Sequence, residues 1–567
     1  MEMKKITKLL IIGLPLLFLI FLIPVLVKQY SPIRYNVEGN IVDLEQRRIF
    51  EGSVDIENGV IVSINQHSIS SGRYIIPGFV DAHVHIESSM LTPQNFGELV
   101  VHCGTVAVVT DPHEIANVMG IKGVEFMIEN SKNSPIKTFF TIPSCVPATP
   151  FDVSGGVLSA SDVEQIASTG QFVGLSEMMN VPGVLSGDTE VMAKLATAKK
   201  YHLTIDGHAP MLKGKDLADY ANNHIRTDHE CVTLEEAQEK IKHGMKILIR
   251  EGSAARNYEV LKTLIKTNPN DVMFCTDDSH PDEIISAGHI NKLVVRSIAN
   301  QFDLFDVLRI ASINPIRHYK LDVGQLRVGD KADFTVVDNL ETFTVLKVYI
   351  NGIEQIEKKL REPLFIDKMN NFNHDKINEA SLCKTVTDSI KVISLVKGEL
   401  LTTVAKYSPK HSGENLESDV GEDIAKIVYI NRYNNSVPQV AFCKGFHLKK
   451  GALASSISHD SHNIIAVGCS DKELTEAINA VIEQKGGLSV SVDGKTEILP
   501  LPVGGIMSDR LGVDVAADYR ELCEAARRTG CGIDSPFMTL SFLSLVVIPE
   551  LKIGEKGLFS YTDFNWI

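Results

Sequence analysis

The stretch Pro77-Gly-Phe-Val-Asp-Ala-His-Val-His85 marks the point in this 567-residue chain at which the pattern of apolar and polar residues changes. From residue 78 onward, apolar runs of strand length end in polar residues, and each is followed by a stretch long enough for a helix. The runs cover residues 79–86, 105–112, 138–145, 172–179, 203–210, 226–230, 246–252 and 271–278. Strands that are apolar along their whole length are typical of a parallel sheet buried on both faces. Eight such strands predict a (β/α)8, TIM-like barrel over residues 78–320.

The regions on either side of the predicted barrel have a different pattern. Residues 36–76 and 324–350 alternate short β-branched runs with polar turns, which favours antiparallel strands. We expect residues 31–77 and 321–365 to form a small β-sandwich beside the barrel. Residues 354–378 are rich in charge and asparagine, as in a linker. Beyond them, residues 380–567 mix strands, such as 427–430 and 464–467, with amphipathic helices, such as 471–483, and predict a separate C-terminal α+β domain.

Composition excludes one class of partner and indicates a cellular environment. The formal net charge of -15, with no basic stripe carrying aromatic residues, argues against binding to nucleic acid. The nine cysteines form no CxxC pair and their number is odd. This pattern favours a reducing compartment over a disulfide framework.

The N-terminus departs from the pattern of a soluble protein. Residues 9–27 form an uncharged apolar run close to the roughly 20 residues that span a bilayer. No small-residue cleavage pattern follows, so residues 1–30 are interpreted as a membrane anchor and not as a secretory signal. Lysines ahead of the run outnumber the basic residues just after it, which would export the barrel. The unpaired cysteines instead favour a cytoplasmic catalytic region, with the helix either reversed in orientation or an artefact of the translation start.

Histidines and carboxylates gather at the carboxyl ends of the predicted strands. Five of the eight runs end in such residues, namely His83 and His85, Glu177, His208, His229, and Asp277 with Asp278. Loops at these ends carry the chemistry of a barrel of this kind. A lone histidine or acid at a strand end is usually a hydrogen-bonded structural residue, and His-x-His alone is weak evidence. The shared level of all these residues nevertheless indicates a metal site.

The donor types suit a pair of divalent ions. Imidazole and carboxylate groups favour transition metals over calcium, and a carboxylate has two oxygens with which to bridge two ions. Glu177 is the candidate bridge. Such ions lower the pKa of water toward neutrality, and Asp277 at the rim could take and return the proton.

Longer motifs resemble a known family. The opening strand and Val328-Gly-Asp-Lys-Ala-Asp333 resemble the amidohydrolase superfamily. More specific stretches resemble the adenine deaminases within it, and this likeness runs from about residue 36 to the end of the chain. These stretches are His85-Ile-Glu-Ser-Ser-Met90, Thr110-Asp-Pro-His-Glu114, Asp206-Gly-His-Ala-Pro210, Asp228-His-Glu-Cys231, Ile249-Arg-Glu-Gly-Ser253, Cys275-Thr-Asp-Asp278, Gly451-Ala-Leu-Ala-Ser-Ser-Ile-Ser-His-Asp-Ser-His-Asn463 and Leu501-Pro-Val-Gly-Gly505.

The resemblance implies a hydrolase that converts adenine and water to hypoxanthine and ammonia. It implies two divalent ions, Mn²⁺ or Fe²⁺, and leaves a homodimer open. Glu177 stands where many superfamily relatives have a carboxylated lysine, which points away from the dihydroorotase and hydantoinase branches. The resemblance also implies six metal ligands, namely His83, His85, Glu177, His208, His229 and Asp277.

Several roles stay open at this level. Glu87, His113 and Glu114 could hydrogen-bond purine nitrogens, with Glu87 and His113 as candidate catalytic groups, but Glu87 could equally orient a histidine. Arg250 could contact substrate or form a local ion pair with Glu251. Residues 459–462 form either a loop that reaches the barrel mouth or a structural turn. A different heterocycle or cyclic amide as substrate, and a non-catalytic membrane-tethered barrel, are the competing readings of function.

Overall fold

A ring of parallel strands forms the centre of the molecule. The computed structural model describes residues 33–355 and 369–567, except residues 71 and 254. Five strands form one parallel sheet and three form a second, and isolated parallel bridges from Ile205 to Ile225 and from Val84 to Asp277 join their edges. The structure thus confirms an α/β, TIM-like domain. Its strands are β5 (Phe79–Val84), β6 (Thr105–Thr110), β7 (Lys137–Ile142), β8 (Phe172–Met178), β9 (Thr204–Gly207), β10 (Thr227–Asp228), β11 (Lys246–Arg250) and β12 (Val272–Cys275).

Helices follow these strands and cover their outer faces. Every residue of β5 and β6 is buried, as expected for strands enclosed on both sides. The helices begin at local signals: Thr233, for example, accepts a hydrogen bond from the Glu236 amide at the start of α9. The helices of this region are α2 (Pro93–Val100), α3 (His113–Met119), α4 (Ile121–Ser131), α5 (Ala160–Ala167), α6 (Val181–Ser186), α7 (Thr189–Lys200), α8 (Gly214–Asn222), α9 (Leu234–Lys242), α10 (Tyr258–Leu261), α11 (Leu264–Thr267), α12 (Pro281–Ala287), α13 (Ile290–Ala299), α14 (Leu304–Leu308) and α15 (Asn314–Tyr319).

Chain from before and after the barrel joins in one seven-stranded sheet. Strand β4 lies between β1 and β13 and so connects the two segments. Buried Asp333 stabilises the junction, because its carboxylate accepts hydrogen bonds from Lys137, 2.6 Å away, and from the Gly324 and Asn351 amides. The strands are β1 (Arg34–Asp43), β2 (Arg48–Glu57), β3 (Val60–Gln66), β4 (Tyr74–Pro77), β13 (Phe334–Val337), β14 (Val345–Ile350) and β15 (Ile353–Glu354).

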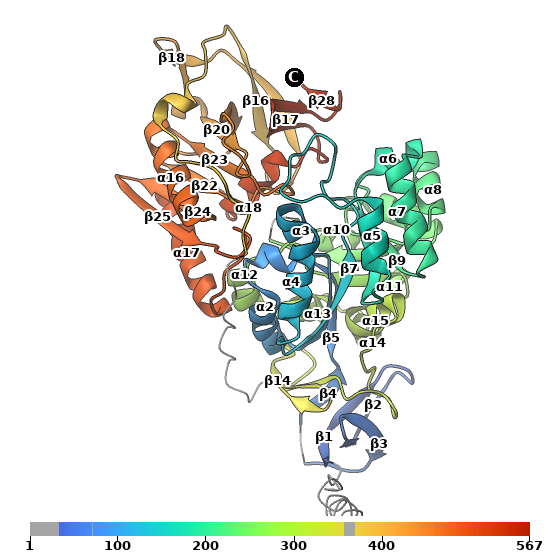
Figure 1. The fold of residues 1–567 in the computed structure, drawn as a ribbon. Helices are drawn as coiled ribbons and strands as arrows, with labels where there is room; N and C mark the ends of the chain where they lie inside the picture. Colours follow the sequence, from blue (N-terminus) through green and yellow to red (C-terminus); the bar gives the residue numbers. More distant parts are fainter. Residues whose placement is uncertain (1–32, 71, 254, 356–368) are drawn as a thin grey trace, which may run out of the picture.

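The C-terminal part of the chain is built on an eight-stranded sheet and packs beside the barrel, away from the seven-stranded sheet (Figure 1). Helix α16 (Asp471–Gln484) buries Leu474, Ile478 and Val481, in keeping with the amphipathic pattern. The sheet contains β16 (Ile390–Leu395), β17 (Thr402–Tyr407), β20 (Ile424–Ile430), β21 (Gln439–Lys444), β22 (Ala452–Ser455), β23 (Ile464–Gly468), β24 (Gly487–Val492) and β25 (Lys495–Pro500). The remaining elements include β18 (Lys410–Ser412), β19 (Asn415–Glu417), α17 (Gly512–Arg528), α18 (Pro536–Ser541), β26 (Leu551–Gly554), β27 (Gly557–Ser560) and β28 (Asn565–Trp566).

The prediction of a transmembrane helix requires correction. Among the described residues, no helix has both the length and the apolar character needed to cross a membrane. The predicted span, residues 9–27, lies outside the described part of the chain. A spanning segment must satisfy its backbone hydrogen bonds in a continuous helix of about bilayer length, and none of the described helices does so. The predicted localisation, a cytoplasmic catalytic region that this helix could anchor to the membrane, is corrected in the same way, because no described helix supports the anchor.

A buried lysine in β26 gives a prediction about stability. Lys552 is fully buried, its ammonium group donates to the Leu400 carbonyl at 2.9 Å, and burial lowers its pKa from 10.5 to about 7. Between these values the unfolded chain holds the proton and the folded chain does not, so stability rises with pH from about 7 to about 10.5. We expect Lys552→Met to raise the thermal midpoint at pH 7 by about 2–4 °C, a gain that shrinks toward pH 10.

Thermal scans of both proteins across this pH range test the prediction. Lys450→Met, at an exposed lysine that pairs with Asp493, is the matched control and should show no such trend. A gain for Lys552→Met that is the same at pH 7 and pH 10 would show that lost charge burial is not the cause.

Candidate metal centre and active site

Six residues from five strand ends meet at one end of the barrel. His83 belongs to β5 and His85 follows it, and Glu177 lies near the end of β8. His208 and His229 come directly after β9 and β10, and Asp277 lies two residues after the end of β12. All six side chains are buried. The structure therefore brings together the whole predicted set, His83, His85, Glu177, His208, His229 and Asp277.

The Glu177 carboxylate lies between two groups of histidines. Its Oε1 atom is 3.2 Å from His85 Nε2 and 3.9 Å from His83 Nε2. Its Oε2 atom is 2.7 Å from His208 Nδ1 and 3.2 Å from His229 Nε2. Asp277 adds to the first group, because its Oδ1 atom is 3.1 Å from His85 Nε2 and 3.6 Å from His83 Nε2. The two Glu177 oxygens thus face different groups of potential metal ligands.

The donor atoms fit a divalent metal centre. The buried Nε2 atoms of His83 and His208 have no hydrogen-bond partner among the described residues. His85 Nδ1 lies 3.1 Å from the Asp111 carbonyl oxygen, to which it donates, so its Nε2 lone pair faces the carboxylates. Buried imidazoles without partners, grouped around carboxylates, are costly unless a cation joins them.

Neighbouring charged groups determine the protonation of the carboxyl groups in the site. Burial opposes ionisation of Glu177, but the neighbouring His229 and His208 hold the pKa of its carboxyl well below the usual range. Burial likewise opposes ionisation of Asp277, but Arg250 together with His83 and His85 outweighs it, so the pKa of this carboxyl is also well below normal. Both groups are therefore carboxylates at neutral pH, the form that binds metal.

Arg250 does not pair with Glu251, its neighbour in sequence. Its guanidinium contacts Asp277 Oδ2 at 2.5 Å and both oxygens of Glu230. Glu251, the expected partner, instead pairs with Arg296. Glu230 was missed in the sequence reading although it directly follows His229, and its Oε1 atom lies 3.3 Å from His229 Nε2.

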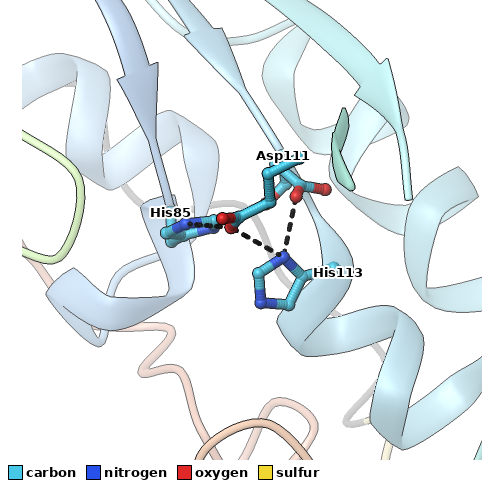
Figure 2. A group of neighbouring side chains, drawn as sticks. His85, Asp111 and His113 are labelled. Carbon is cyan, nitrogen blue, oxygen red and sulfur yellow. Dashed lines mark hydrogen bonds and ion pairs between the residues drawn. The ribbon is translucent and has the colours of Figure 1, made fainter. Parts of the chain in front are cut away.

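His113 is the first residue of α3, and its ring lies next to that of His85. Its Nδ1 atom is 2.7 Å from the Asp111 carboxylate, and Figure 2 shows its ring beside that of His85. Its Nε2 atom is 3.4 Å from Glu114 Oε1. Asp111, which the sequence reading missed, lies two residues before His113 and fixes the orientation of its ring.

Glu114 is bound from the C-terminal part of the chain. His459 Nδ1 lies 2.6 Å from Glu114 Oε1, and His462 Nε2 contacts Oε2. The loop that holds these histidines therefore reaches the barrel mouth, which settles one alternative left open by the sequence.

Glu87 lies behind the site. Its Oε1 atom accepts a hydrogen bond from the Ile115 amide at 3.2 Å, and it does not line the pocket described next. Burial raises the pKa of its carboxyl to about 7. Its catalytic and substrate-binding roles stay predictions.

A small pocket opens over the centre. The barrel supplies most of its polar lining, including Glu114, Arg250 and Asp278. The C-terminal part adds His459, Asp460 and an apolar wall made of Leu400, Phe542, Leu545 and Ile548.

Comparisons with known proteins agree with this architecture. Residues 74–354 match the profile of the amidohydrolase family, and residues 399–565 match the adenine deaminase C-terminal domain. The barrel and its buried centre thus define a hydrolase of the amidohydrolase class, which acts on C–N bonds.

Curated relatives narrow the assignment. The chain is 50% identical to the adenine deaminase of Methanosarcina acetivorans over 93% of this chain and 98% of the relative. It is 46% identical to that of Sulfurovum sp. and 43% identical to that of Borreliella burgdorferi, each over 94% of this chain and 99% of the relative. The chain belongs to the adenine deaminase family.

Solved structures are more distant. A 5-methylcytosine deaminase from Klebsiella pneumoniae is 14% identical, with a TM-score of 0.43 over 58% of this chain and 99% of that chain. An N-acetyl-D-glucosamine-6-phosphate deacetylase from Mycobacterium smegmatis is 13% identical, with a TM-score of 0.44 over 56% of this chain and 99% of that chain.

Proposed function

We propose that the protein deaminates free adenine hydrolytically to hypoxanthine and ammonia. The observation that carries the proposal is the position of Glu177 between two groups of buried metal donors, in a chain 43–50% identical to named adenine deaminases. The small pocket supports a small-molecule substrate.

The centre is proposed to hold two divalent ions, Mn²⁺ or Fe²⁺. His83, His85 and Asp277 would hold one ion, His208 and His229 the other, and Glu177 would bridge them. When bound, such ions lower the pKa of water and polarise the group under attack.

The protein's own side chains then manage the proton. Asp277 presents Oδ1 to the centre, while Arg250 binds its Oδ2 and fixes the carboxylate in place. We assign Asp277 the proton of the attacking water, which it returns to the amine so that the amine leaves as ammonia. Asp111 orients His113 for contact with the purine, and Glu114, held by the C-terminal histidines, is assigned to the same wall.

The domain assignment follows from these roles. Residues 78–320 are proposed as the catalytic barrel, residues 31–77 and 321–365 as the flanking β-sandwich, and residues 380–567 as an α+β domain that covers the barrel mouth. Support for the last assignment comes from His459 and Phe542, which line the same pocket as the metal donors.

The choice of substrate is tested with a purine panel. We expect manganese-loaded protein to release ammonia from adenine at least about 100-fold more efficiently than from adenosine or guanine, because a site built around the polar edges of one base rejects bases that leave its groups unpaired. Ammonia release and product absorbance measure this. Comparable turnover of adenosine and adenine would refute specificity for the free base. Ammonia release from a different heterocycle, with none from adenine, would assign another amidohydrolase reaction.

A further inference from the structure

The loop of residues 456–463, between β22 and β23, is fixed in the C-terminal part of the chain. The Ser456 hydroxyl donates to the Gly505 carbonyl at 2.6 Å, and the Tyr433 hydroxyl donates to the Ser461 carbonyl at 2.6 Å. The His459 ring stacks on Phe542 with centroids 4.4 Å apart. These anchors hold the loop in one conformation, so it can position side chains for a ligand.

The same loop projects three polar side chains into the barrel mouth. His459 and His462 bind the two oxygens of Glu114. Between them in sequence, Asp460 places Oδ1 3.9 Å from His113 Nε2, and its carboxyl lines the pocket over the metal donors. A carboxyl group from the C-terminal part thus shares the site with the barrel residues.

Asp460 differs from the other carboxyl groups around this pocket. Glu177 and Asp277 face histidines, Glu230 is paired with Arg250, and Glu114 with His459 and His462. Asp278 accepts a hydrogen bond from Ser88. Asp460 is only 4% exposed, yet its Oδ2 atom has no hydrogen-bond partner among the described residues. A buried polar atom of this kind requires an explanation, and a ligand is one.

A purine edge is chemically suited to this carboxyl. Free adenine presents a hydrogen-bond donor next to an acceptor on more than one edge, for example N9–H beside N3, an edge that hypoxanthine keeps. Burial raises the pKa of Asp460 to about 7, so near neutral pH the group can donate through its hydroxyl and accept through its carbonyl oxygen.

We propose that Asp460 contacts the purine directly and determines which edge of the base the site accepts. This inference rests on the proposed deamination of adenine. It makes the C-terminal part of the chain a source of substrate specificity, in addition to a cover for the barrel.

Binding of hypoxanthine, the product, tests the contact without turnover. In manganese-loaded full-length protein, Asp460→Ala should weaken hypoxanthine binding measured by calorimetry, and raise KM for adenine, by about ten- to a hundredfold. The change in kcat should be smaller. Asp460→Asn, which keeps a donor and an acceptor, should recover most of the loss. Metal content should stay the same in both variants.

Asp419→Ala is the matched control. Asp419 is also a buried carboxyl of the C-terminal part, but its oxygens are bound by Tyr407 and Lys410, outside the pocket. Its removal should lower the thermal midpoint and leave purine binding unchanged. Asp460→Ala should weaken purine binding and leave the thermal midpoint unchanged, because no hydrogen bond from a described residue to its Oδ2 is lost.

Adenine analogues identify the edge that is contacted. With 1-deaza-, 3-deaza-, 7-deaza- and 9-methyladenine, the loss caused by Asp460→Ala should disappear for the analogue that lacks the contacted atom, as in a double-mutant cycle.

The outcomes separate this inference from the function on which it rests. Unchanged hypoxanthine binding together with an unchanged KM for adenine in Asp460→Ala, loss of metal from it, or equal losses for every analogue would overturn the inference while adenine deamination stands. If the parent protein neither binds nor deaminates any purine, the proposed function fails and the inference fails with it.

Discussion

Glu177→Ala is expected to remove one or both metal ions and to lower kcat/KM for adenine by at least about 10³-fold. Its two carboxylate oxygens face different groups of histidines, so no single neighbour can replace it. The loss of charge would also leave His208 and His229 without the carboxylate that their rings contact at 2.7 and 3.2 Å.

Metal analysis of the purified variant and steady-state kinetics check this result. Glu129→Ala, at an exposed glutamate that pairs with Lys132, is the matched control and should keep full metal and activity. Full occupancy of two ions in Glu177→Ala would show that Glu177 is not the bridge.

Asp277→Asn is expected to lower kcat by about 10²- to 10⁴-fold while most of the metal stays bound. The Asp277 carboxylate faces His83 and His85, whereas Asp278 accepts a hydrogen bond from Ser88. Asp278→Asn should therefore reduce the rate by a much smaller factor. Parallel kcat and metal measurements on the two variants decide between them, and the reverse order of damage would assign the proton to Asp278.

The backbone gives the reason for the difference between these two aspartates. Strand β12 ends at Cys275, and Asp277 has a φ of 57°, in the left-handed region that aspartate adopts only at some cost. Simple alternation along a strand predicts opposite directions for the two side chains, but both line the pocket. The turn at Asp277, and not strand pleating, brings its carboxylate to the histidines.

Local patterns predicted the barrel and the convergence of histidines and carboxylates at its strand ends. Buried strands and strand-end histidines are encoded within short windows, so their level in the barrel follows from the sequence. Helix α16 was predicted over residues 471–483 and is found over Asp471–Gln484. Strand β10 was predicted over residues 226–230 but covers only Thr227–Asp228, since His229 and Glu230 have already turned into the site.

Contacts between segments far apart in the chain could not be predicted from sequence patterns. His459 lies 345 residues from Glu114, and no periodicity relates a loop of the C-terminal part to the start of α3. Pairing of Arg250 with Glu230 was also missed, because adjacency favoured Glu251 while the three-dimensional arrangement gave that residue to Arg296. The expected membrane anchor rested on composition alone, and it is the feature that required correction.

The most direct test of a binuclear adenine deaminase is reconstitution of the metal-free protein. Mn²⁺ would be added in measured equivalents, and ammonia and hypoxanthine formed from adenine would be quantified at each step. We predict that the rate rises until about two equivalents are bound and then levels off, with equal amounts of both products. A maximum at one equivalent would contradict the bridged pair of ions, and absence of ammonia at every metal loading would contradict the deaminase assignment itself.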